Sequence, residues 1–224
     1  MITGASRGIG RAIAVRLADR YSIIAAARNR DKLESLAREI RDGGGECTPV
    51  AVDLREPDAI ASALEGVEAD VVVNNAGIVN LKPFLELTPD EWHEMVDVNL
   101  NAIYHVTRAV LPGMMTRGRG HVMLIGSISG RSWFVGGTCY TATKHALMGF
   151  SESLMLEVRD SGVGVSVIMP GSVATDVFDD GRDTSWMITA EDVAESVDHV
   201  LSTPHHVLVH RLEIRALQPR KKQK

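Results

Sequence analysis

Short, almost continuously apolar runs alternate along the chain with longer segments of helical periodicity. The runs 22–27, 47–52, 70–74, 121–125, 163–169 and 207–216 are typical of strands. Strands that are apolar on both faces are covered by helices on both faces, which favours a parallel sheet over an antiparallel sandwich. We therefore expect an α/β protein with a doubly wound parallel sheet in a three-layer arrangement.

A seventh strand should precede the first glycine-rich turn, but only Met1 and Ile2 are available for it. This strand is either truncated or continues upstream of Met1, because a strand usually needs about five residues. The helix after the turn places Ile9, Ile13 and Leu17 at intervals of four, which gives one apolar stripe. We expect that stripe to pack on the sheet.

Composition and charge limit what the chain can be. Its 224 residues, 45% hydrophobic and 24% charged, suit one globular domain spanning 1–224. The net charge is -5 and the basic residues gather only in the tail 219–224, which argues against a nucleic-acid partner. The longest uncharged run, 161–175, is shorter than the ~18 residues of a membrane span. With only two cysteines, a reducing cytoplasm is the expected location.

A second apolar stripe is interrupted by a single amide. The segment opens with Thr88-Pro89-Asp90-Glu91, a typical capping-box start. Its stripe comprises Trp92, Val96, Asn99, Ile103, Val106 and Val110. Because a buried amide without partners costs about 1–3 kcal/mol, Asn99 is either a structural bridge or part of a site.

The segment Thr3-Gly4-Ala5-Ser6-Arg7-Gly8-Ile9-Gly10 joins the first strand to an amphipathic helix. Glycine lacks the Cβ that would block the approach of a pyrophosphate, and free N–H groups at a helix start attract anions. The spacing differs from the G-x-G-x-x-G fingerprint, and a glycine-rich turn alone is as often structural as functional.

Four further motifs follow the turn in order: Asn74-Asn75-Ala76-Gly77, Ser127, the pair Tyr140 and Lys144, and Pro170-Gly171. Together with the turn they resemble the short-chain dehydrogenase/reductase family over nearly the whole chain. The resemblance implies a Rossmann-type sheet in the order 3-2-1-4-5-6-7 that binds a nicotinamide dinucleotide at the carboxyl ends of its strands.

The resemblance also implies the residues that hold the cofactor. They are Gly4, Ser6, Arg7, Gly8, Ile9, Gly10, Arg28, Asp53, Leu54, Asn75, Ala76, Gly77, Tyr140, Lys144, Pro170, Gly171, Val173 and Thr175. Asp53 and Leu54 correspond to adenine contacts, although Asp53 can also be an ordinary turn residue. Val173 and Thr175 correspond to contacts with the nicotinamide.

The second strand ends in Ala26-Ala27, with alanine where family members that prefer NAD tend to carry Asp, and Arg28 follows directly. A 2′-phosphate needs positive charge at this place, and Arg7 supplies a second basic residue. We therefore predict NADP(H) as the cofactor, with Arg28 on the phosphate. The alternative is that Arg28 and Arg30 only solvate a loop.

Tyr140 and Lys144 are spaced i, i+4, so on a helix both side chains project from one face. A cation near the phenol lowers its pKa from about 10, which lets it exchange protons near neutral pH. By resemblance Tyr140 is the general acid or base, Lys144 holds the nicotinamide ribose, Ser127 binds the substrate carbonyl and Asn99 supports a proton relay. Ser127 is chosen over Ser129 because it lies nearer the strand end.

The remaining signals are weaker. A short substrate lid is expected at about 176–188. Candidate substrate walls are Trp133, Phe134, Val177, Phe178, Trp186 and Met187. The histidines His205, His206 and His210 are expected to be surface residues, and no metal site is predicted. Cys139 is expected to be a passive neighbour of the site.

Three function classes follow from these residues. The leading one is an NADP(H)-dependent oxidoreductase acting on a carbonyl or secondary alcohol. The alternative is a non-catalytic NADP-binding regulator on the same fold, and an epimerase or dehydratase usually needs a longer chain. The C-terminal part resembles the 3-hydroxy acid dehydrogenase branch, and the family implies a homotetramer or homodimer.

Overall fold

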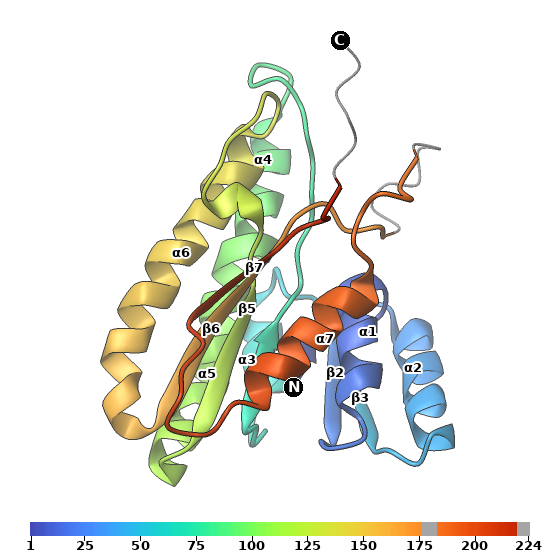
Figure 1. Ribbon diagram of the computed structural model, residues 1–224, viewed down its shortest axis with the longest axis vertical. Helices are drawn as coiled ribbons and strands as arrows, with labels where there is room; N and C mark the ends of the chain where they lie inside the picture. Colours follow the sequence, from blue (N-terminus) through green and yellow to red (C-terminus); the bar gives the residue numbers. More distant parts are fainter. Residues whose placement is uncertain (176–182, 219–224) are drawn as a thin grey trace.

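In a computed structural model, which describes residues 1–175 and 183–218, parallel strands form one twisted sheet between two helical layers (Figure 1). Its strands are β1 (Ile2–Thr3), β2 (Ile23–Ala27), β3 (Cys47–Ala51), β4 (Val71–Asn74), β5 (Gly120–Ile125), β6 (Val163–Pro170) and β7 (Arg211–Ile214). Their order is β3-β2-β1-β4-β5-β6-β7, and every pairing is parallel. The predicted fold class and strand order are confirmed.

The helices divide between the two faces of the sheet. One face carries α1 (Gly8–Leu17), α2 (Arg30–Asp42) and α7 (Ala190–Leu201), and the other carries α3 (Pro57–Ala63), α5 (Ala102–Arg117) and α6 (Thr138–Val158). Shorter elements are α4 (Pro89–Val96), the π-helical turn η1 (Asp97–Asn101) and the 3₁₀ turns η2 (Ile128–Gly130) and η3 (Arg159–Ser161). In the described segments, none of the helices combines the length and apolar character needed to span a bilayer.

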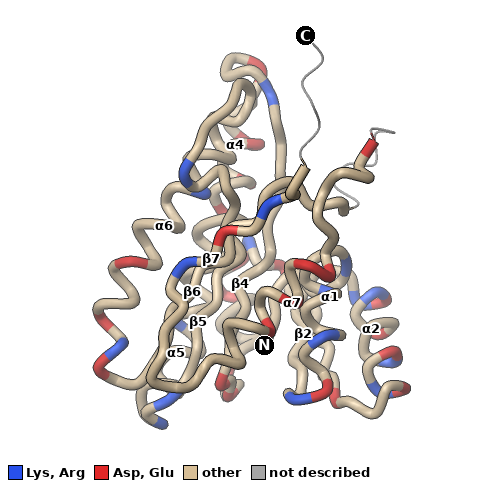
Figure 2. Tube along the Cα trace, viewed as in Figure 1, with Lys and Arg blue, Asp and Glu red and all other residues tan. Residues whose placement is uncertain are grey.

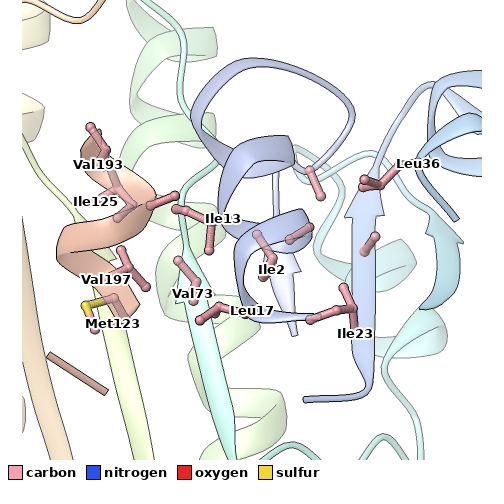
Figure 3. Packing of buried hydrophobic residues seen from close by; sticks show 14 of the residues in the cluster. Ile2, Ile13, Leu17, Ile23, Leu36, Val73, Met123, Ile125, Val193 and Val197 are labelled. Atoms are coloured by element: carbon pink, nitrogen blue, oxygen red, sulfur yellow. The ribbon is translucent and has the colours of Figure 1, made fainter. Parts of the chain in front are cut away.

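Each face of the sheet has its own hydrophobic core. Figure 3 shows Ile13 and Leu17 of α1 meeting Ile2 and Val73 of the sheet, as the i, i+4 stripe predicts. The short strand β1 is held from both sides, since Ile2 pairs with Ala25 of β2 and with Val73 of β4. The sheet is therefore continuous across its centre, and the turn that follows β1 starts from a fixed position.

The long helix predicted after Thr88 is not uniform. The Thr88 capping box is present at the start of α4, as predicted. The chain then widens into the π-helical turn η1, which the sequence did not predict, before α5 continues. Asn99 lies in this turn and is fully buried, as the stripe required.

The last strand is shorter than predicted: β7 covers Arg211–Ile214 rather than 207–216. The physical reason is that side chains take the place of ladder hydrogen bonds before Arg211. The hydroxyl of Ser166 donates to the carbonyl of Val209 (2.7 Å), and Nδ1 of His210 lies 2.8 Å from the carbonyl of Val165.

Charged residues of both signs are mixed along the outer surfaces of the helices (Figure 2). They alternate along α2, where Arg30–Asp42 contains basic and acidic residues throughout. The loops above α4 are by contrast mostly uncharged (Figure 2).

Candidate active site

A cleft of about 450 Å³ opens along the carboxyl ends of the strands. It is lined by residues that follow β1, β2, β3 and β4, together with the ends of β5 and β6. The predicted residues that line it are Gly4, Ser6, Arg7, Gly8, Ile9, Arg28, Asp53, Leu54, Asn75, Ala76, Gly77, Tyr140, Lys144, Pro170, Val173 and Thr175. Four other predicted residues, Gly10, Gly171, Asn99 and Ser127, are not part of this lining.

The glycine-rich turn forms one end of the cleft. Gly4 and Gly8 have φ values of 66° and 53°, a region that favours glycine. Arg7, the N-cap residue of α1, makes no capping hydrogen bond with its side chain. The first N–H groups of α1 are therefore left for an anion, as a pyrophosphate cradle requires.

Gly10 differs from Gly4 and Gly8 in that it does not line the cleft. A Cβ at this position would overlap the carbonyl oxygen of Gly4 and the amide of Asn75. Gly10 therefore allows α1 to pack closely beneath the turn, and it shapes the cleft without lining it.

Positive charge gathers where β2 ends. Arg28 is exposed and lines the cleft, and so do Asn29 and Lys32, which sequence reasoning missed. The side chain of Asn29 accepts a hydrogen bond from the backbone N–H of Lys32 (2.9 Å) and caps α2. Two cationic side chains thus stand beside a helix N-terminus, which itself favours an anion. Arg28 precedes α2, so its spacing of four from Lys32 is not a helical spacing and gave no signal for Lys32.

Asp53 lines the cleft after β3 and is tied to Arg55, another residue that sequence reasoning missed. Nε of Arg55 donates to both carboxylate oxygens of Asp53 (3.1 and 3.2 Å), and Nη1 reaches Glu94 of α4 (3.2 Å). Hydrogen bonds from Arg55 hold the pKa of Asp53 below its usual value. Asp53 is therefore ionised and held in one orientation.

Ser127, Tyr140 and Lys144 come together between the end of β5 and the start of α6. Burial raises the pKa of Tyr140, and a hydrogen bond with Ser127 opposes this rise. Nζ of Lys144 lies 5.8 Å from the centre of the Tyr140 ring and donates to the carbonyl of Ile125 (3.0 Å). Burial lowers the pKa of Lys144 to about 8. Burial, and not the charge of Lys144, thus dominates the pKa of Tyr140, which differs from our expectation.

Asn99 connects the loop after β4 to α6. Its Oδ1 accepts from the N–H of Ile78 (2.8 Å), and its Nδ2 donates to the carbonyl of Ile78 (2.9 Å) and to Oγ1 of Thr143 (3.3 Å). Thr143 in turn donates to the carbonyl of Tyr140 (2.8 Å). Of the two interpretations left open for Asn99, the structural bridge is thus present, and it ends at the helical turn that carries Tyr140.

The weaker predictions have mixed outcomes. His205 and His206 are exposed, but His210 is not a free surface histidine, because Nε2 lies 3.1 Å from Oε1 of Glu152. Cys139 is buried, and burial raises the pKa of its thiol. Val177 and Phe178 lie outside the described residues. In the described ranges, no group of three His, Cys, Asp or Glu could hold a metal ion.

Comparison with known proteins places these features in a family. The family model described as short chain dehydrogenase matches residues 1–186. The NADP-dependent 3-hydroxy acid dehydrogenase of Salmonella typhi is 33% identical over 233 residues, covering 96% of this chain and 93% of that protein.

Solved structures agree with this match. An alcohol dehydrogenase from Thermococcus sibiricus, complexed with 5-hydroxy-NADP, superposes with a TM-score of 0.91 at 30% identity, covering 99% of this chain and 98% of that chain. A metagenomic short-chain oxidoreductase in complex with NADP gives 0.87 at 34% identity, with coverages of 97% and 96%. Serine dehydrogenase from Escherichia coli gives 0.85 at 33% identity, with coverages of 96% and 95%. On sequence and fold together, the chain belongs to the short-chain dehydrogenase family.

Proposed function

We propose that the protein is an NADP(H)-dependent oxidoreductase that interconverts a carbonyl compound and its secondary alcohol. The observation that carries this proposal is the grouping of Tyr140 with Lys144, one helical turn away at the same cleft, and with Ser127, whose hydroxyl favours the ionised form of Tyr140. A protein that only sensed the nucleotide would need the cleft and not this grouping.

NADP(H) as the cofactor is supported by the charge at the end of β2. Arg28 and Lys32 line the cleft beside the N-terminus of α2, and Ala27 stands where a carboxylate would repel a phosphate. The relatives named above agree, since the S. typhi enzyme is NADP-dependent and the metagenomic structure contains NADP. The start of α1 has no side-chain cap, and a Cβ on Gly8 would meet only the side chain of Thr175, itself a cleft residue, at 3.7 Å, so the residues present fit the cofactor.

The side chains divide the chemistry between them. When bound, NADP(H) supplies or accepts the hydride. Tyr140 gives its phenolic proton to the carbonyl oxygen in reduction and takes it back in oxidation, while Ser127 donates a hydrogen bond to the same oxygen. Lys144 offsets the charge that develops on the phenolate. Asn99 fixes the loop that carries Ile78, and by resemblance it supports refilling of the proton.

The test is Tyr140→Phe, which removes the hydroxyl and keeps the ring. Turnover should fall at least ~10²-fold, within the usual contribution of general acid catalysis, while the dissociation constant for NADPH stays nearly the same. Tyr104→Phe is the matched control, because Tyr104 lies exposed on α5. Near-normal turnover of Tyr140→Phe with any carbonyl substrate would defeat the assignment.

The substrate panel should begin with the compounds that the relatives' names suggest. These are 3-hydroxy acids, serine and alcohols. Each is assayed in both directions with NADPH or NADP. Steady NADPH consumption with any carbonyl compound would exclude the purely regulatory alternative. The homotetramer or homodimer implied by the family remains a prediction for sedimentation measurements.

A further inference from the structure

Two loops at the carboxyl edge of the sheet carry a concentration of exposed apolar side chains. One loop joins β4 to α4, and the other joins η2 to α6. We call their exposed side chains the apolar rim: Leu81, Phe84, Leu85, Trp133, Phe134 and Val135, with exposed fractions from 42% to 98%. Apolar patches of this kind are uncommon on a protein surface and usually mark a binding site.

The two loops form one surface. The backbone N–H of Lys82 donates to the carbonyl of Gly136 (3.0 Å), and in Figure 1 both loops rise together above α4 and α6. The charge of Lys82 is balanced by an ion pair with Glu91 of α4. The surface between the loops is therefore predominantly apolar, in agreement with the few charged residues that Figure 2 shows there.

The apolar rim adjoins both the cleft and the helix that carries Tyr140. Val79, which precedes Leu81 in the same loop, is 37% exposed and lines the cleft. On the other loop, the ring of Phe134 packs so closely on Gly137 that a Cβ there would lie 2.6 Å from it. Gly137 is the N-cap of α6, and Tyr140 lies in the first turn of that helix. An extended molecule whose carbonyl lies at Tyr140 can thus reach the rim directly.

Resting on the proposed function, we propose that the apolar rim binds the hydrocarbon part of the substrate. The enzyme then prefers carbonyl compounds that carry an alkyl or aryl chain of several carbons over small polar oxo acids. The rim shares a loop with Val79, which lines the cleft, and Phe134 packs on the start of the helix that carries Tyr140, which favours a substrate chain over a second copy of the protein. An apolar chain gains affinity in proportion to the surface that it buries there.

The experiment measures kcat/KM with NADPH for methyl ketones from 2-butanone to 2-decanone. For the native protein we expect a rise of about two- to fourfold for each added methylene, the range set by partial to full burial. Trp133→Ser combined with Phe134→Ser should flatten this dependence and leave NADPH binding unchanged. Leu156→Ser, which changes an exposed apolar residue of α6 outside the rim, should keep the chain-length dependence of the native protein.

Val135→Ser is a milder second variant, because Val135 is 98% exposed and its replacement cannot disturb the core. A chain-length dependence that is flat in the native protein, or unchanged in the rim variants, would overturn the proposal. A rim variant that changes the oligomeric mass in sedimentation but leaves the chain-length dependence of kcat/KM unchanged would also overturn the proposal, since the rim would then join copies of the chain. Turnover of small polar oxo acids alone defeats only the rim proposal, whereas no turnover of any carbonyl compound defeats the proposed function as well.

Discussion

Two groups of polar side chains, one at the carboxyl edge of the sheet and one away from that edge, have opposite surroundings. Ser127, Tyr140 and Lys144 meet at the carboxyl edge, where Tyr140 and Lys144 line the cleft. The second group, which we call the closed cluster, consists of two bonded pairs: His121 of β5 with Ser166 of β6, and His210, just before β7, with Glu152 of α6. Nε2 of His121 lies 2.8 Å from Oγ of Ser166, a geometry that would suit a nucleophile and its base.

The closed cluster is nevertheless a structural device. The Ser166 hydroxyl donates to the carbonyl of Val209, so His121 must donate its Nε2 proton to Ser166. Ser166 is fully buried, and none of the four residues lines the cleft. A pair of reactive residue types therefore does not mark a site, and what distinguishes Tyr140 and Lys144 is that a ligand can reach them.

Burial acts on both groups but with different consequences. It lowers the pKa of His121 to about 4 and that of Lys144 to about 8. At the cleft, a bound ligand can compensate for part of the lost solvation. His121 does not line the cleft, so the effect of burial on its pKa should appear as a dependence of stability on pH.

The largest expected effect is acid destabilisation through His121. Its pKa in the folded protein, about 4, lies below its ordinary value of 6.5. The contribution of neutral His121 to the free energy of unfolding is therefore complete above pH 6.5. It is lost as the pH falls from 6.5 toward 4, by on the order of 3 kcal/mol. Urea denaturation of the native protein and of His121→Gln, measured at several pH values, tests this.

His121→Gln keeps a donor for Ser166 but does not titrate. Below pH 6.5 the native protein should lose stability more steeply than this variant. If the free energies of unfolding of the two proteins depend on pH in the same way, the fold does not oppose protonation of His121. The closed cluster would then not differ from the cleft in this respect.

The second effect concerns the exposed cations of the cleft. Arg28→Ala should weaken NADPH binding about 10- to 100-fold, because a charge-assisted hydrogen bond contributes roughly 1.5–3 kcal/mol. NADH binding should change little. Arg30→Ala is the matched control, since Arg30 is exposed nearby but does not line the cleft. Equal losses for NADPH and NADH would place Arg28 away from the 2′-phosphate.

The sequence predicted best what depends on neighbours in the chain. Apolar runs predicted the parallel sheet, while the strand order and most of the cleft lining were implied by the resemblance of the motifs to a known family. Contacts between distant segments were not predictable in this way. The bond between Asn99 and Thr143 spans 44 positions, and β7 is short because Ser166, from another strand, takes the carbonyl of Val209. Only the folded arrangement reveals such partners.

The smallest expected effect tests whether the bridge from Asn99 supports Tyr140. Thr143 is a positioning residue, because it accepts from Asn99 and donates to the carbonyl of Tyr140. Thr143→Val keeps the shape and removes both bonds, so kcat should fall about three- to tenfold, equivalent to one hydrogen bond of about 1 kcal/mol, with KM for NADPH unchanged. Thr143→Ser, which keeps the hydroxyl, should retain most of the native kcat.

Thr141 is the matched control for this measurement. Its buried hydroxyl has no hydrogen-bond partner among the described residues, so Thr141→Val should leave kcat near the native value and not lower stability. The pH dependence of kcat separates positioning from packing, because a merely structural loss at Thr143 would lower the melting temperature without moving that profile. If Thr143→Val and Thr141→Val behave alike in both measurements, the bridge holds the helix but does not support Tyr140. The cleft would then resemble the closed cluster in this respect, with polar bonds that only satisfy buried atoms.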